Sequence, residues 1–339
     1  MPEISMKKKH FNIPVFIPEL ACPFQCIYCN QKKISGCLKV PSSEEINKMI
    51  NDHLSTIPNE DTDTELAFFG GNFTGLSPNE QENFLKIVQP FIEKGKISGI
   101  RVSTRPDNID LDVLKLLKKY NVKTIELGAQ SMDNKVLRQV GRGHTSEDTI
   151  EAAMMIKEGG FSLGLQMMIG LPGDTLQKSI CSARKIIELK SDNTRIYPVL
   201  VIKGTRLEEL YRTGEYQPLT LDEAVTWSKE LLKIFEEANV KVIRIGLHPS
   251  EGLLSGDELV AGPFHPSFRE LVLTEVWHDL LEPLKEKGKK VEITVAPDQL
   301  NYAIGYNSKN KKMLLHHFNQ VAFIPDPALQ GRNFICSYL

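Results

Sequence analysis

The segment Ile13-Pro-Val-Phe-Ile17, followed by Cys22-Pro-Phe-Gln-Cys26-Ile-Tyr-Cys29, decides the fold. Its first part is a short apolar run that predicts a buried β-strand. Its second part places three cysteines, spaced C-x3-C-x2-C, in the loop after that strand. Apolar runs of the same kind recur along the chain. They predict strands at residues 13–17, 65–69, 99–103, 122–127, 162–168, 195–201 and 240–245.

Helical patterns separate these strands, at residues 43–55, 78–93, 111–119, 146–157, 176–189 and 221–237. Several of them open with a capping signature, namely Ser42 before Glu45, Ser77 before Glu80 and Thr220 before Glu223. The strands are nearly continuous apolar runs, as expected where helices cover a parallel sheet. The alternation predicts a parallel α/β barrel, complete or partial, over residues 10–249, with a doubly wound open sheet as the alternative. In both folds the catalytic groups lie at the carboxyl ends of the strands.

The tail, residues 250–339, does not continue this alternation. Residues 249–266 are rich in Gly, Pro and His and predict a long loop. After the loop we expect a helix at 268–286, a strand at 291–295, a helix at 309–318 and a strand at 320–324. These elements predict a small C-terminal α+β domain with its boundary near residue 250.

The composition is that of an ordinary globular protein, with 41% hydrophobic and 25% charged residues among 339. The formal net charge of −2 argues against a globally basic nucleic-acid binder, although it still allows a local basic face. The sequence shows neither a secretory signal nor an apolar run of the roughly 18 residues that a membrane helix needs. A cytoplasmic location is therefore expected.

Three of the six cysteines fall within eight positions, which in a chain of this size favours a metal site over a disulfide framework. Zinc sites and ferredoxin-type clusters usually take four protein ligands. Three thiolates on a four-iron cluster would leave one iron for the amine and carboxylate of an amino acid, with its sulfonium beside an electron donor. Two alternatives stay open: three cysteines packed as small hydrophobic residues, and Cys37 as a fourth ligand or redox partner.

The cysteine motif, with Tyr28 before its third cysteine, resembles the hallmark C-x3-C-x-aromatic-C of the radical S-adenosylmethionine superfamily. Further motifs follow in the order found in the radical domain of the Elongator catalytic subunit family, which modifies wobble uridine in tRNA. They are Gly70-Gly71-Asn72-Phe73-Thr74, Ser103-Thr104-Arg105-Pro106, Glu126-Leu-Gly-Ala-Gln130-Ser131, Arg142-Gly143-His144-Thr145, Met167-Met168-x-x-Leu171-Pro172 and Ile196-Tyr197-Pro198 with Ile202 and Gly204-Thr205. The similarity covers about residues 10–218. Elongator subunits end in an acetyltransferase domain, and the residues after 250 resemble none.

The resemblance implies a barrel of the radical SAM type that carries a [4Fe-4S] cluster on Cys22, Cys26 and Cys29. With an electron from a reductant such as flavodoxin or ferredoxin, it implies cleavage of S-adenosylmethionine to methionine and a 5′-deoxyadenosyl radical. Two arginines are the expected catalytic residues, Arg105 and Arg142. The expected cofactor-binding residues are Tyr28, Gly70, Gly71, Asn72, Ser103, Glu126, Gln130 and Gln166. Structural alternatives stay open: a turn for the glycines, polar side chains that only face solvent for Glu126 and Gln130, and an ion pair for each arginine.

RNA, and tRNA in particular, is the substrate that the Elongator-like motifs imply. In the tail, Ile304-Gly305-Tyr-Asn-Ser-Lys309, with Lys311 and Lys312, resembles the phosphate-clamping loop of KH-type RNA-binding domains without its second glycine. A small molecule such as a tetrapyrrole or metabolite is the alternative substrate, because relatives of the anaerobic coproporphyrinogen oxidase share a similar barrel. A non-enzymatic iron–sulfur protein is the third possibility, and the Gly70-Gly71 segment argues against it.

Overall fold

The computed structural model describes residues 9–17, 22, 26–30, 33, 39–58, 62–284 and 290–339. Within them, seven strands form one parallel sheet in the order β1-β2-β3-β4-β5-β6-β8. The strands are β1 (Lys9–Phe16), β2 (Thr62–Phe69), β3 (Gly99–Thr104), β4 (Val122–Gln130), β5 (Ser162–Ile169), β6 (Asn193–Pro198) and β8 (Lys241–Ile245). Because the spatial order follows the chain order, the sheet curls as a partial barrel and is not doubly wound.

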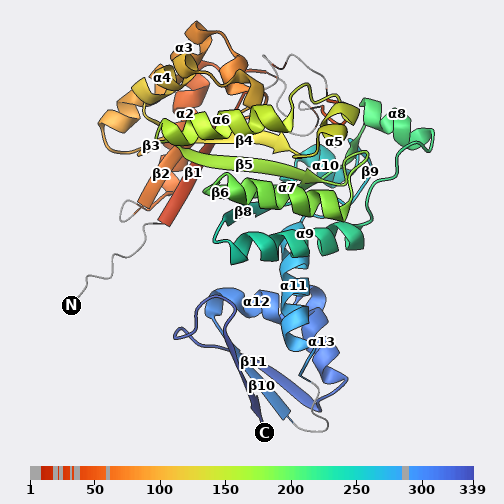
Figure 1. Ribbon diagram of the computed structural model, residues 1–339. Coiled ribbons are helices and arrows are strands. Elements are labelled where there is room, and N and C mark those ends of the chain that lie inside the picture. Colours follow the sequence, from red (N-terminus) through yellow and green to blue (C-terminus); the bar gives the residue numbers. More distant parts are fainter. Residues whose placement is uncertain are drawn as a thin grey trace.

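Helices cover the outer face of this sheet (Figure 1). The long ones are α2 (Ser43–Thr56), α3 (Pro78–Glu93), α4 (Leu111–Lys119), α6 (Ser146–Glu158), α7 (Leu176–Glu188) and α9 (Leu221–Glu237). Each lies within two residues of its predicted range. Capping boxes at Ser42, Ser77 and Thr220 confirm the helix starts predicted from the sequence. Shorter elements connect them: η1 (Phe73–Gly75), η2 (Pro106–Asn108), α5 (Asn134–Gln139) and α8 (Arg206–Arg212).

The two faces of the sheet differ in polarity. Side chains that point outward, such as Ile13, Leu66 and Ile125, are fully buried in the main hydrophobic core under the helices. Alternate positions, which point to the inner face, hold charged residues, among them Glu65 and Arg101. The expectation of nearly continuous apolar strands was therefore wrong for the inner face, where the partial barrel gathers polar groups.

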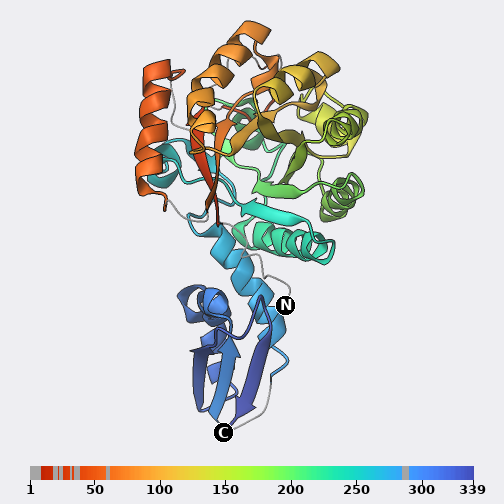
Figure 2. The ribbon, with the colours of Figure 1, turned by 90° about the vertical axis from the view of Figure 1, so that its left-hand side faces the viewer.

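The C-terminal region packs around a second, smaller sheet (Figures 1 and 2). Helix α11 (Phe268–Leu281) joins the two parts, because Phe268 and Val272 lie in the main core whereas Trp277 and Leu281 lie in the core of the small sheet. In that sheet the central strand β10 pairs with β11 in parallel and with β12 antiparallel. Its elements are β10 (Lys290–Val295), η3 (Pro297–Gln299), α12 (Leu300–Ile304), η4 (Tyr306–Ser308), α13 (Lys309–Leu315), β11 (Gln320–Pro325) and β12 (Phe334–Tyr338).

Three details of the predicted elements were wrong. The strand predicted at 195–201 is two strands: β6 ends at Pro198, which cannot donate to a ladder, and β7 (Val201–Ile202) pairs antiparallel with β9 (Leu259–Ala261). The loop predicted at 249–266 therefore contains β9 and also α10 (Glu251–Ser255). Helices α5, α8 and α12 and strand β12 were missed, because they are short and short elements depend on tertiary packing. Within the described residues, no helix is long and apolar enough to cross a membrane.

Candidate active site at the carboxyl ends of the strands

The described residues of the cysteine motif, Cys22 and 26–29, lie between β1 and α2 along the chain. The backbone amide of Cys29 donates to the carbonyl of Cys26 at 2.9 Å, which forms a tight turn. Two further backbone bonds fix this turn to other segments: Ile27 N–H donates to the Val140 carbonyl at 3.1 Å, and Leu207 N–H donates to the Ile27 carbonyl at 2.7 Å. Segments that follow β4 and β7 thus hold the motif, as expected of a site at the carboxyl ends of the strands.

Apolar side chains pack around the second half of the motif, residues 26–29. Cys26 and Tyr28 are 5% and 8% exposed, and both belong to a cluster that also contains Val136, Val140, Leu171, Val199, Val201, Leu207 and Tyr216. Burial, with the nearby Cys26 thiol as the next cause, raises the pKa of Tyr28 above its usual value, so the phenol stays neutral. This environment is poor in water and suits a site that must be shielded from solvent.

The donor set of the motif fits an iron–sulfur cluster. Soft thiolate ligands without carboxylates select iron–sulfur clusters and thiophilic metals. In the described part of the chain, no three His, Cys, Asp or Glu side chains form a group that could hold a metal ion. A four-iron cluster is larger than an ion, so its three thiolates need not converge on one point. Cys37, the alternative fourth ligand, lies outside the described residues.

Arg142 reaches this site from the segment after α5. Its guanidinium donates from Nη1 to Cys26 Sγ at 3.6 Å and from Nη2 to the Gly128 carbonyl at 2.9 Å. Gly128, on β4, leaves the room for it, because a Cβ there would stand 2.9 Å from Nη2. Beside it, Gln166 donates from Nε2 to Gln130 Oε1 at 3.2 Å. The structure thus brings Arg142 to the cysteine loop and joins Gln130 and Gln166 near the ends of β4 and β5.

A second group links the ends of β2 and β3. Asn72 Oδ1 accepts hydrogen bonds from Thr104 Oγ1 at 2.7 Å and from the Arg105 amide at 3.2 Å. Arg105, 1% exposed, pairs with both oxygens of Asp107 at 2.9 Å and donates to the Arg142 carbonyl at 2.7 Å. Arg105 therefore has the ion pair that was its structural alternative, and it holds the backbone that carries Arg142.

Packing against the end of β1 explains why glycine occupies position 70, directly after β2. Gly70 has φ +96, and a Cβ there would stand 2.4 Å from the carbonyl oxygen of Ile17 and 2.8 Å from the ring of Phe16. Only glycine fits against the end of β1 at this point. Gly71 also has a positive φ, of 26°. The turn that was the structural alternative for these glycines is thus present, and a role toward S-adenosylmethionine stays a prediction.

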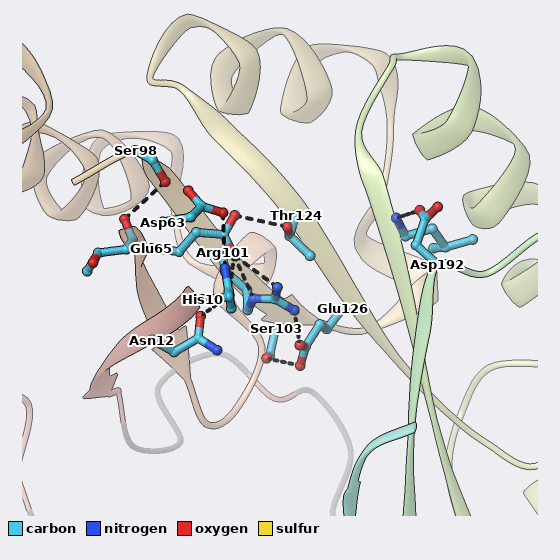
Figure 3. A network of polar contacts seen from close by, with 12 residues as sticks. His10, Asn12, Asp63, Glu65, Ser98, Arg101, Ser103, Thr124, Glu126 and Asp192 are labelled. Atoms are coloured by element: carbon cyan, nitrogen blue, oxygen red, sulfur yellow. Dashed lines mark hydrogen bonds and ion pairs between the residues drawn. The ribbon is translucent and has the colours of Figure 1, made fainter. Parts of the chain in front are cut away.

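Glu126 belongs to a buried ion-pair network on the inner face of the barrel (Figure 3). Arg101 lies between Glu65 and Glu126, with N···O distances of 2.9 and 2.6 Å, and Arg195 donates to both oxygens of Glu126 at 2.9 and 3.0 Å. Burial opposes the charge of Glu126, but Arg195 and Arg101 outweigh it, so the pKa of this carboxyl lies below its usual value. Ser103 Oγ is 3.5 Å from the same carboxylate. Protein groups thus contact both carboxylate oxygens of Glu126, which was expected to bind the cofactor.

Sequence reasoning missed three members of this network, Glu65, Arg101 and Arg195. Their signal was present as charged residues at alternate positions of apolar strands, where a buried charge must find a partner. The partners lie 25 to 69 positions apart in sequence, so only the register of the strands reveals them.

Comparison with known proteins places the chain in a family. The Radical SAM superfamily model matches residues 17–180, and the Radical SAM C-terminal domain model matches residues 191–278. An uncharacterized protein of Methanocaldococcus jannaschii is 31% identical over 231 residues, which are 64% of this chain and 69% of that protein. This chain belongs to the radical SAM superfamily, whose enzymes use a [4Fe-4S] cluster and S-adenosylmethionine.

Two further relatives differ in the activity that their names give. The tRNA uridine(34) acetyltransferase of M. jannaschii is 32% identical over 48% of this chain, and the heme chaperone HemW of Bacillus subtilis is 26% identical over 62% of it. The matches span 34% of the acetyltransferase and 54% of HemW. The structure of Elp3 from Methanocaldococcus infernus superposes with a TM-score of 0.63 at 22% identity, over 82% of this chain and 64% of that one, which confirms the fold.

Proposed function

We propose that this protein is a radical SAM enzyme that modifies RNA, with tRNA as the substrate, and that Cys22, Cys26 and Cys29 hold its [4Fe-4S] cluster. A cluster bound there would supply the electron for reductive cleavage of S-adenosylmethionine to methionine and a 5′-deoxyadenosyl radical. The observation that carries the RNA proposal is the 32% identity to a protein named as a tRNA uridine(34) acetyltransferase. Because the match spans a third of that protein, acetyl transfer does not belong to the proposal.

The chain's own residues would position and shield this chemistry. The apolar cluster around Cys26 and Tyr28 would keep water from the radical. Gln130 and Gln166, joined by a hydrogen bond near the ends of β4 and β5, offer amide groups for the polar parts of the cofactor. Asn72 and Arg105 lie at the neighbouring strand ends. Glu126, held by two arginines, would fix neighbouring strands of the sheet at the site.

Anaerobic release of 5′-deoxyadenosine tests the proposal. The reconstituted protein is incubated with S-adenosylmethionine, a reductant such as reduced flavodoxin or ferredoxin, and a tRNA pool. We expect release to rise at least tenfold with intact tRNA and to return to the basal rate after the pool is digested with ribonuclease. Equal release with and without intact tRNA would refute RNA as the substrate while leaving the cleavage reaction in place.

A small-molecule substrate is the second candidate, supported by the similarity to the heme chaperone HemW. The same assay decides between the two. Release that depends on an added tetrapyrrole, and is indifferent to tRNA, would favour this candidate.

A further inference from the structure

Arg142 is a buried cation that pairs with no carboxylate of the described residues. Arg142 is 7% exposed. Among the described residues, no Asp or Glu side chain lies within ion-pair distance of its guanidinium. Its Nε is buried and meets no acceptor in that part of the chain. Burying a charge without a counter-charge is costly, and buried charges in proteins are paired or bound to an ion or cofactor. An anionic partner is therefore to be expected at this point.

The contacts of Arg142 point to what that partner is. Nη1 faces Cys26 Sγ at 3.6 Å, whereas Nη2 is held by the Gly128 carbonyl. The backbone is fixed as well, because the Arg142 amide donates to the Leu137 carbonyl at 3.0 Å and its carbonyl accepts from Arg105. Gly141 and Gly143, on either side, adopt positive φ values of 65° and 83° that favour glycine. A rigid segment thus aims one end of the guanidinium at a cysteine sulfur.

We propose that Arg142 donates a hydrogen bond to the Cys26 thiolate and thereby raises the reduction potential of the cluster. Arg142 is then a positioning residue for the electron-transfer step. One electron from the external reductant takes the cluster core from the 2+ to the 1+ state, and no bond is formed or broken. Hydrogen bonds to cluster sulfurs and burial are known determinants of such potentials.

The physical reason lies in the charge that reduction adds. The cluster with three thiolates is already anionic, and the apolar surroundings of Cys26 screen its charge poorly. A fixed guanidinium next to a ligand sulfur stabilises the reduced form more than the oxidised form. Without it, the reductant would have to deliver its electron into a buried anion at a more negative potential.

Redox titration of the reconstituted full-length protein, followed by EPR and without S-adenosylmethionine, tests this inference. In Arg142→Gln we expect the ratio of reduced to oxidised cluster at a fixed potential to fall about tenfold, which corresponds to about 59 mV for a one-electron couple. Arg142→Lys keeps the charge and should lie between that variant and the wild type. The matched control is Arg138→Gln, which removes the same charge from an exposed position of α5 and should change the ratio less than twofold.

Gly128→Ala is a second, independent route. A Cβ at position 128 would stand 2.9 Å from Arg142 Nη2 and 2.7 Å from Gln130 Nε2, so the guanidinium must shift while every charge is kept. We expect the reduced fraction to fall about threefold. If Arg142→Gln does not retain the cluster, this variant and Arg142→Lys decide the question.

Two outcomes would overturn the inference. One is a full complement of iron with an unchanged potential in Arg142→Gln and in Gly128→Ala. The other is an unchanged potential with weakened binding of S-adenosylmethionine, which would make Arg142 a ligand of the cofactor's carboxylate. The inference rests on the proposed cysteine ligands but not on the proposed RNA substrate, and iron loss in Cys26→Ala tests those ligands separately.

Discussion

Arg101, on strand β3, and Arg142, after helix α5, are both buried, but they are held in opposite ways. Arg101 lies between two carboxylates, those of Glu65 and Glu126. Arg142 has a carbonyl and a sulfur as its described partners. A paired buried charge serves the fold, because removing either partner leaves the other stranded. A buried charge without a counter-charge is better explained by a ligand, and the contrast separates the charges that hold the strands from the charge that serves the cofactor.

The largest expected effect follows from removing the paired arginine. Arg101→Met leaves two buried carboxylates without their central partner, so we expect a loss of about 3–5 kcal/mol in the free energy of unfolding. Denaturant unfolding of the metal-free protein measures it. The control Arg206→Met removes an exposed pair with Glu209, in which both side chains are about two-thirds exposed, and should cost about 0–1 kcal/mol. Equal, small effects of both changes would contradict the structural role of the network.

The next effect is the pH dependence of stability that comes from His144, which lies near Arg142 and Arg105. His144 is 3% exposed, and burial together with Arg142 and Arg105 lowers its pKa to about 3. Between about pH 6.5 and 3 the unfolded chain binds a proton here and the folded chain does not, so the stabilisation is complete above pH 6.5 and is lost as the pH falls. As the pH falls from 6.5 to 5, we expect His144 to lower the free energy of unfolding by about 2 kcal/mol. Unfolding of metal-free wild type and His144→Gln at pH 7, 6 and 5 measures it, and parallel curves for the two proteins would contradict it.

A smaller effect is expected from removing the arginine without a carboxylate. Among the residues that the structure describes, Arg142→Gln leaves no carboxylate without its partner, and the lost hydrogen bonds are offset by relief of a buried charge. We therefore expect the free energy of unfolding to change by less than about 1.5 kcal/mol, against the much larger loss in Arg101→Met. A loss as large as that of Arg101→Met would place Arg142 with the structural charges.

The smallest effect belongs to a site outside both regions. Ser42 Oγ accepts from the Glu45 amide at 3.2 Å at the start of α2, and Ser42→Ala should cost about 1 kcal/mol. Because this cap shares no partner with Arg101, its cost should add to that of Arg101→Met within about 0.5 kcal/mol. Denaturant unfolding of the single and double variants measures the sum. Clear non-additivity would mean that the two sites are coupled through the sheet.

Local signals were sufficient to predict most of the large domain. The capping boxes at Ser42, Ser77 and Thr220 and the apolar strand runs depend on neighbours in sequence, and the observed helices and strands follow them closely. The prediction was wrong where tertiary contacts decide, as in β9, which exists because it pairs with β7.

The site was predictable in its chemistry but not in its connections. The cysteine spacing, the strand-end glycines and Arg142 are readable from the sequence. That Arg101 lies between Glu65 and Glu126 depends on strand register across three strands, which short motifs do not encode. The motif around Glu126 predicted a contact with the cofactor. Its place in the ion-pair network depends on the strand register and was therefore missed.

Iron content measured together with 5′-deoxyadenosine release in Cys26→Ala tests the central claim most directly, with Cys181→Ala, an exposed cysteine, as the matched control. We predict that anaerobically reconstituted Cys26→Ala loses the cluster's iron and releases no 5′-deoxyadenosine above the blank, while Cys181→Ala behaves like the wild type. A Cys26→Ala protein with full iron content and unchanged cleavage of S-adenosylmethionine would contradict the claim.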